Sequence, residues 1–411
     1  MNLKRREFCA WSMALGVTGS EAIAQSQSAN IHPVWLGFGL NIGANAAAQR
    51  FPLSNALLPI QRPGRKTTFQ LEVNEAISQQ LRALGDTVTF QNATDIGGDT
   101  LLGAVLDYEN VLEARLGDAN FIVMHMVGHG VLLDFDRTRG WSMRASYPFP
   151  VTLLRESKGS TESTAKQYLA DAYLDPQNSF ATSFAKATKR LSPRWKQNGG
   201  ASGFNIRVTS CTIHPDVAVK LKTWGIEKNI SPTWLGHLAS AAICEGLDVP
   251  VVPFAETQSL GNYTYKFSDR LTAQNVRMPS DDDIDLRIHV SLRNMAREIK
   301  YRNQFERWEA ARMIVLDIKV KDESNQDILS IRMGYQDEQP DALAREEDNS
   351  PARDAHFFDM AIYRGLNLFF SGVEKGDLNL LAKVMVKPDP QQSQAINEFK
   401  RRYRNGFAKG V

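Results

Sequence analysis

Two histidines four positions apart, His125 and His129, belong to the residue type that most often binds transition metals. On a helix this spacing would place both imidazoles on one face, as a zinc site requires. The surrounding Phe, Ile, Val and Met residues and two glycines favour a strand instead. Four residues of a strand span about 13 Å, so the two rings could not share one ion at about 2 Å. We therefore predict no metal site and no catalytic role here, and expect both histidines on a partly buried sheet face.

Two cysteines, Cys211 and Cys244, follow the predicted leader described below. Cys211 ends a predicted strand, and Cys244 lies near the end of a predicted helix. In an oxidising compartment the two could form a disulfide. The alternative is a pair of buried thiols that pack as small apolar groups. Both interpretations stay open, because the Cα spacing that a disulfide needs cannot be read from a sequence.

An acidic segment at 337–354 contains two prolines and follows a predicted hairpin. Its composition predicts an exposed loop. We predict that the loop contacts other proteins, through side chains that include Glu346, Glu347 and Asp348.

The last segment, 389–411, combines basic and aromatic residues after a proline-rich break. Arg401, Arg402 and Tyr403 lie at its centre. Such a tail could bind an anionic lipid, an acidic polymer or a partner protein. The alternative is a solvated terminal helix. We predict these three residues as partner-binding residues.

Several signatures of catalysis and cofactor binding are missing from the sequence. It contains no Gly-x-Ser-x-Gly, no Cys-x-x-Cys and no His-Glu-x-x-His. We therefore predict no catalytic residue and no cofactor. Scattered Ser, His and Asp residues could still meet in space, so an enzyme stays open as an alternative.

Hydrophobic patterns predict the elements that must position these residues. In the first unit, 30–193, we predict strands at 34–42, 86–91, 120–134 and 141–154, and helices at 72–84, 101–116, 164–174 and 178–191. In the second unit, 205–388, we predict strands at 205–213, 249–254, 286–299, 311–321 and 327–335, and helices from 231 and over 355–373. Gly, Asn and Ser residues at 194–204 predict a linker between the units.

Both units repeat the order strand, helix, strand, long antiparallel hairpin and closing helix. This order predicts an α/β or α+β fold of two related units and suggests an internal duplication. Coincidence is the alternative, because the two halves share no repeat of individual residues.

The first 24 residues have the pattern of an export signal. A basic start is followed by a short apolar run and by small residues at Ala22 and Ala24. Arg5, Arg6 and Phe8 resemble a twin-arginine translocation signal, and the general secretory route is the alternative. We expect cleavage near Ala24 and a periplasmic or secreted protein.

Composition limits the partners of the chain. Charged residues make up 23% of its 411 residues, and the formal net charge is +2. This balance gives no reason to expect nucleic-acid binding. A membrane-spanning helix needs about 20 apolar residues, and no segment provides them. The oligomeric state cannot be read from the sequence.

The order of elements at 232–256, 285–299 and 313–335 resembles a class of exported bacterial envelope domains. This class includes the TolB amino-terminal domain, the curli-secretion lipoprotein and a flagellar envelope protein. The resemblance covers about 205–375, concerns architecture and rests on no diagnostic motif. It implies a role in envelope assembly or scaffolding.

Three hypotheses about function follow. The first is a soluble, non-enzymatic periplasmic protein that contacts other envelope proteins. The second is an exported enzyme or a protein that binds a cofactor or metal and uses the twin-arginine route. The third is a module that binds a small envelope ligand or glycan in a groove lined by tryptophans.

Overall fold

The computed structural model describes residues 32–41, 51–85, 88–90, 100–116, 119–136, 138, 140–157, 161–198, 203–255, 262–267, 274–302, 307–340, 351–385 and 390–408. The predicted leader and the predicted partner residues Glu346, Glu347 and Asp348 lie outside these residues. The architecture is mixed α/β, as predicted, and its helices pack against two sheets.

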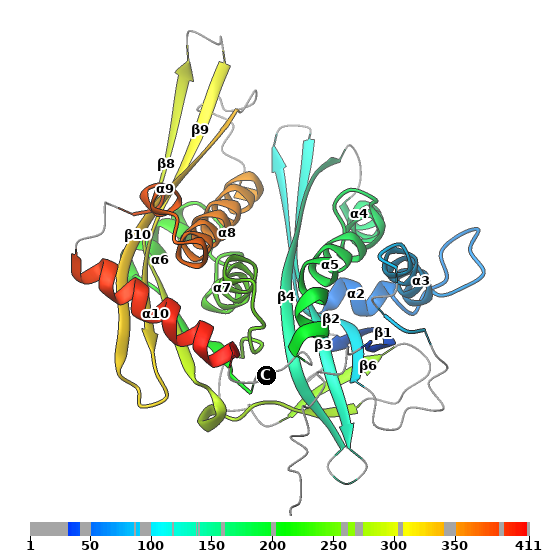
Figure 1. The fold of residues 1–411 in the computed structure, drawn as a ribbon. Coiled ribbons are helices and arrows are strands. Elements are labelled where there is room, and N and C mark those ends of the chain that lie inside the picture. The colour runs from blue at the N-terminus through cyan, green and yellow to red at the C-terminus, as the bar shows by residue number, and fades with distance from the viewer. Residues whose placement is uncertain are drawn as a thin grey trace, which may run out of the picture.

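The elements form layers. Helices α7 (Pro232–Leu247) and α8 (Pro351–Lys375) lie between the two sheets (Figure 1) and contact strands of both. Helices α3 (Phe69–Arg82), α4 (Thr161–Leu174) and α5 (Phe180–Asn198) pack against the first sheet. Because α7 has packed elements around it, almost all of its residues are buried.

The first sheet closes on itself in the order β1-β2-β3-β4-β7-β6. Its strands are β1 (Val34–Asn41), β2 (Thr100–Leu116), β3 (Ala119–Asp136), β4 (Gly140–Ser157), β6 (Asn262–Phe267) and β7 (Gln274–Arg277). Strands β6 and β7 follow the predicted linker, yet they pair with β1 and β4. The chain therefore returns to complete the first sheet. Helix α5 continues to Asn198 and so occupies the start of the predicted linker at 194–204.

The second sheet is open and has the order β10-β9-β8-β5. Its strands are β5 (Ile206–Ile213), β8 (Leu286–Arg302), β9 (Arg307–Lys321) and β10 (Asp327–Pro340). The two sheets have the same order of strand directions. In each, the first strand is parallel to the second, β1 to β2 and β5 to β8, and antiparallel strands follow. The internal duplication itself stays a prediction.

The predicted helix at 101–116 is wrong, because this segment is strand β2. Its first half pairs with β1 and β3, and its side chains are buried on both faces, because Leu102 and Leu106 belong to one core cluster and Leu101 and Val105 to another. A strand that is covered on both faces is a continuous apolar run. Such a run has no period that separates it from a buried helix.

The predicted strand at 86–91 is also wrong. Among its described residues, Thr89 forms an isolated bridge with Val34. Two backbone hydrogen bonds, from Trp35 to Thr89 and from Thr89 to Pro33, form this bridge, and farther along β1 the partner is β6, at Gly39 to Asn41.

The predicted strand at 249–254 likewise reduces to an isolated bridge at Val252. The backbone N–H of Val252 donates to Ile206 in the second sheet, whereas that of Val251 donates to Ser146 in the first. The segment therefore connects the two sheets and extends neither.

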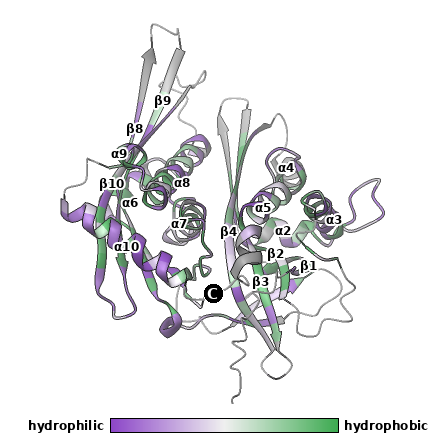
Figure 2. Cartoon of the chain, in the orientation of Figure 1, coloured by the Kyte–Doolittle hydropathy of each residue, from purple (hydrophilic) through white to green (hydrophobic). Residues whose placement is uncertain are grey.

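The remaining helices are α2 (Pro52–Leu57), α6 (Pro215–Thr223), α9 (Leu378–Ala382), α10 (Pro390–Ala408) and the 3-10 turn η2 (Asp281–Asp283). Helix α10 is mostly hydrophilic (Figure 2) and packs against β10 and α8. No helix in the described part of the chain is long and apolar enough to cross a bilayer.

Candidate metal centre

Asp107 is the extra residue of a β-bulge in β2. Leu106 pairs with Gly128, and Tyr108 pairs with the adjacent Val127, so the register skips Asp107. A bulge re-aims the side chain of its extra residue, and bulges are common next to functional sites. The carboxylate of Asp107 is thereby directed into the interior, where the residue is 2% exposed.

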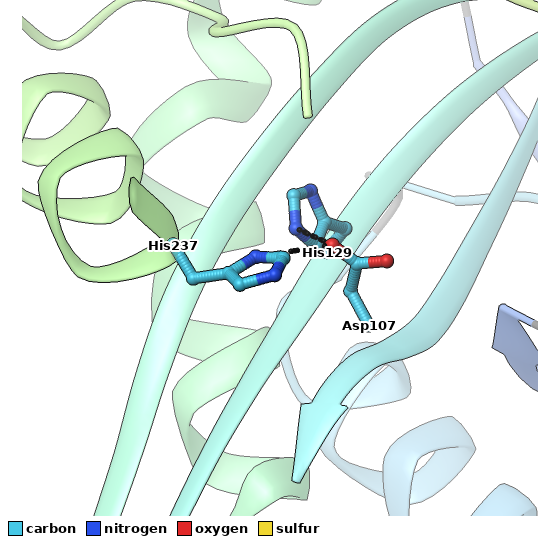
Figure 3. Close-up of side chains that lie close together, drawn as sticks. All are labelled: Asp107, His129 and His237. Carbon is cyan, nitrogen blue, oxygen red and sulfur yellow. Dashed lines mark ion pairs between the residues drawn. The ribbon is translucent and has the colours of Figure 1, made fainter. Parts of the chain in front are cut away.

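This carboxylate meets two histidines from other elements. Asp107 Oδ2 lies 3.2 Å from Nε2 of His129, on β3, and 3.3 Å from Nδ1 of His237, on α7 (Figure 3). One possible ligand atom from each residue lies within 4.8 Å of the other two. The three residues are buried, so these polar atoms converge away from solvent.

Neighbouring residues contact the second polar atoms of His129 and Asp107. Ser146 Oγ lies 2.7 Å from His129 Nδ1, and Asn41 Nδ2 donates to Asp107 Oδ1. When His129 donates its Nδ1 proton to Ser146, the lone pair of Nε2 points at the cluster. Partners of this kind fix the tautomer and orientation of metal-binding histidines.

The distances from Asp107 Oδ2 to the two histidine nitrogens, 3.2 and 3.3 Å, match those between ligand atoms of a zinc ion. Two ligand atoms about 2.0–2.1 Å from a tetrahedral zinc ion lie roughly 3.3–3.4 Å apart. Nε2 of His129 is buried and contacts Asp107 Oδ2 at 3.2 Å, but it makes no hydrogen bond of good geometry with the described residues. An unsatisfied buried nitrogen is costly, and a coordinated cation would satisfy it. Two imidazoles and one carboxylate are a donor set that zinc and Fe(II) both accept.

His125 lies on β3 with His129, as the predicted strand requires, but it has a different carboxylate partner. Its Nδ1 lies 2.8 Å from Oδ2 of Asp359, on α8. The two histidines therefore do not share a site. Both are fully buried, whereas we expected partial burial, because α7 and α8 cover this face of the sheet.

A second buried carboxylate on β2, Glu109, has a structural role. It accepts hydrogen bonds from the backbone N–H groups of Leu53 and Ser54 at 2.9 and 3.1 Å, and from the Ser54 hydroxyl. That hydroxyl also lies 2.7 Å from Tyr173 Oη. Burial raises the pKa of Glu109, and the hydrogen bonds oppose this rise. The group thus anchors the start of α2 to the first sheet.

Sequence reasoning considered His129 as a metal ligand and rejected it, and it did not consider Asp107 or His237. Asp107 lay inside a predicted helix, and His237 lay in the predicted helix that starts at 231. The available signal was a polar residue within an apolar run, because such residues are buried only when they have partners.

The two cysteines are free thiols in the structure, on β5 for Cys211 and in α7 for Cys244. The sequence left open a disulfide or two thiols, and the structure contains the two thiols. Burial raises the pKa of the Cys211 thiol and so keeps it protonated.

The predicted partner residues of the tail lie on α10 and mostly contact the protein itself. Tyr403 is 2% exposed, and its hydroxyl donates to Glu374. Arg402 Nη1 donates to Asp322 at 2.9 Å. The side chain of Arg401 is 65% exposed and therefore remains accessible to a partner.

No protein-family model matches this chain, and no curated protein matches it either. The likeness to TolB-type envelope domains stays a prediction. The arrangement of the described side chains is therefore the basis for assigning a function.

Proposed function

We propose that this protein is an exported cell-envelope protein that holds one divalent transition-metal ion at Asp107, His129 and His237. The proposal rests on the convergence of three buried donor atoms. Asp107 Oδ2 lies 3.2 Å from the nitrogen of His129 and 3.3 Å from that of His237. Zn²⁺ fits these distances and this donor set best.

We infer that the ion stabilises the fold, with three protein ligands that leave a fourth coordination position open. Its ligands come from β2, β3 and α7, so coordination ties the first sheet to the middle layer. The binding free energy of the ion adds to the free energy of folding, so the occupied centre stabilises the fold.

Location in the envelope rests on the leader-like pattern at 1–24. The twin-arginine route carries proteins that fold before export, which would allow the chain to bind its metal in the cytoplasm. Cell fractionation and sequencing of the mature amino terminus test this part. Intact Met1 on protein found only in the cytoplasm would contradict it.

Metal analysis of the purified full chain tests the centre. After dialysis against Zn²⁺ and removal of excess ion, we expect one zinc per chain. Asp107→Asn and His237→Gln should each lose the ion, because each removes a ligand atom. His125→Gln is the matched control, because it changes a buried histidine beside another carboxylate and should retain zinc. Circular dichroism verifies that each variant is folded.

Two results would overturn the metal centre. One is a folded wild-type chain that binds no divalent metal at all. The other is a set of folded ligand variants that retain as much zinc as His125→Gln.

We also propose contacts with other envelope proteins at the outer edge of β10. In the described part of the chain, β10 pairs with β9 and with no other strand. The Gly334 N–H on this strand is already occupied, because it donates to the carbonyl of Val384, whereas other polar backbone groups of an edge can pair with an added strand. A photo-reactive side chain at Gln336 should cross-link a discrete envelope protein, and one at the exposed Glu75 on α3 should not. Equal cross-linking from both positions would contradict this proposal.

A further inference from the structure

A cavity of about 540 Å³ is lined by residues of β4, α5, α7 and α8. Its volume falls within the range of sites for small molecules. The three residues of the metal centre do not line it. It is therefore a second candidate site, formed by other residues.

The wall from β4 is a strand edge that cannot pair further. Strand β7 pairs with β4 only at 141–142. Pro148 and Pro150 lie farther along β4 and lack the N–H groups that an added strand would need. Together with Leu238 and Met360 they give the cavity apolar walls.

Most of the charge in the cavity is compensated within the protein. Arg190 lies 3.6 Å from Glu245 and 3.2 Å from Asp248. The side chain of Asp359 accepts a 2.8 Å hydrogen bond from Trp234 Nε1 and also contacts His125. Arg190 therefore has carboxylate partners within the protein, and Asp359 has a hydrogen-bond donor in Trp234.

Two other polar side chains in the cavity remain available. The exposed Lys186 forms no ion pair with the described residues, and its Nζ lies 3.5 Å from the carbonyl oxygen of Gln177. Nδ1 of His356 has no hydrogen-bond partner among the described residues. Burial, with a smaller contribution from His125, lowers the pKa of His356 to about 4, so the ring is neutral near pH 7. Lys186 is thus a cation of the lining that no carboxylate of the described residues pairs with.

We propose that this cavity binds a small organic anion whose acidic group contacts Lys186 and whose apolar body lies against Pro150, Leu238 and Met360. A carboxylate on an ammonium group forms a charge-assisted hydrogen bond. Removal of the apolar body from water adds to the affinity. The proposal goes beyond the metal centre and does not depend on it.

Calorimetric titration of the purified full chain tests this site. The probes are linear carboxylates of four to ten carbons, with amines and alcohols of the same lengths as comparisons. We expect the carboxylates to bind best and affinity to increase with chain length until the cavity is filled. Lys186→Gln should weaken carboxylate binding roughly tenfold. Lys189→Gln is the matched control, because it removes an exposed lysine of the same helix that does not line the cavity.

A second variant tests the position of the apolar body. Met360→Trp places a larger side chain in the cavity and should abolish binding of the longer carboxylates, while circular dichroism shows that the fold is kept. The proposal is overturned if no carboxylate binds, if the amines bind better, or if Lys186→Gln and Lys189→Gln have equal affinities.

Discussion

Trp234 Nε1 donates a 2.8 Å hydrogen bond to Asp359 Oδ1, and this bond joins the two helices of the middle layer. The same indole ring stacks on Tyr108 of β2, with ring centroids 5.1 Å apart, and lies 5.1 Å from the His125 ring of β3. Trp234 thus connects α7, α8 and the first sheet at one buried point.

This contact predicts a measurable cost when the indole N–H is removed. Trp234→Phe should lower the free energy of unfolding by at least about 1–3 kcal/mol, because Asp359 would keep a buried, partly unsatisfied carboxylate. Urea denaturation measures the change. In the Asp359→Asn background, Trp234→Phe should lower the free energy of unfolding by less than it does in the wild type. Equal losses in the two backgrounds would show that the two residues are not coupled.

The buried ion pair between Asp354 of α8 and Arg312 of β9 predicts a larger loss of stability when it is broken. Asp354 is 1% exposed and accepts hydrogen bonds from Arg312 Nε at 2.9 Å and Arg297 Nη1 at 2.5 Å. Asp354→Ala should cost about 3–5 kcal/mol, because Arg312 would stay buried without its anion. Asp317→Ala, which breaks exposed pairs on the second sheet, is the control and should change stability much less. Equal losses in thermal denaturation would contradict this prediction.

His356 predicts a dependence of stability on pH. Burial lowers its pKa from 6.5 to about 4, so the unfolded chain binds more protons than the folded chain between these values. This contribution to the free energy of unfolding is therefore complete above pH 6.5 and is lost as the pH falls through 4. The total loss is at most about 3 kcal/mol. His356→Gln should remove it. The test is the difference between wild type and variant in urea denaturation at pH 7 and pH 4, and a constant difference contradicts the assignment.

Close packing of α7 against α8 predicts that Gly246 cannot accept a side chain. A Cβ atom there would lie 2.6 Å from Cβ of Phe370 and 3.1 Å from the carbonyl oxygen of Asn367. Gly246→Ala should destabilise the protein by about 1–3 kcal/mol, although alanine normally favours a helix. Gly334→Ala, where the nearest atom would be 3.7 Å away, should change the melting temperature little. The prediction fails if the first variant melts at the wild-type temperature.

Local chemistry was enough to predict several elements. Helix α7 begins where Ser231 accepts a hydrogen bond from the backbone of Trp234 and Pro232 occupies the first turn, and both are local signals. The hairpin of β3 and β4 was likewise predicted from two extended apolar runs that flank a polar turn. The strand position of His125 and His129 followed from the residues beside them.

Contacts between distant segments determined the rest. Strand β2 was mistaken for a helix because its apolar run is covered on both faces, and the covering elements lie elsewhere in the chain. Asp107 and His237 are separated by more than a hundred residues and meet because a bulge turns one carboxylate toward α7. Local propensities act over a few neighbouring residues, whereas a binding centre requires a position in space that the packing of whole layers defines.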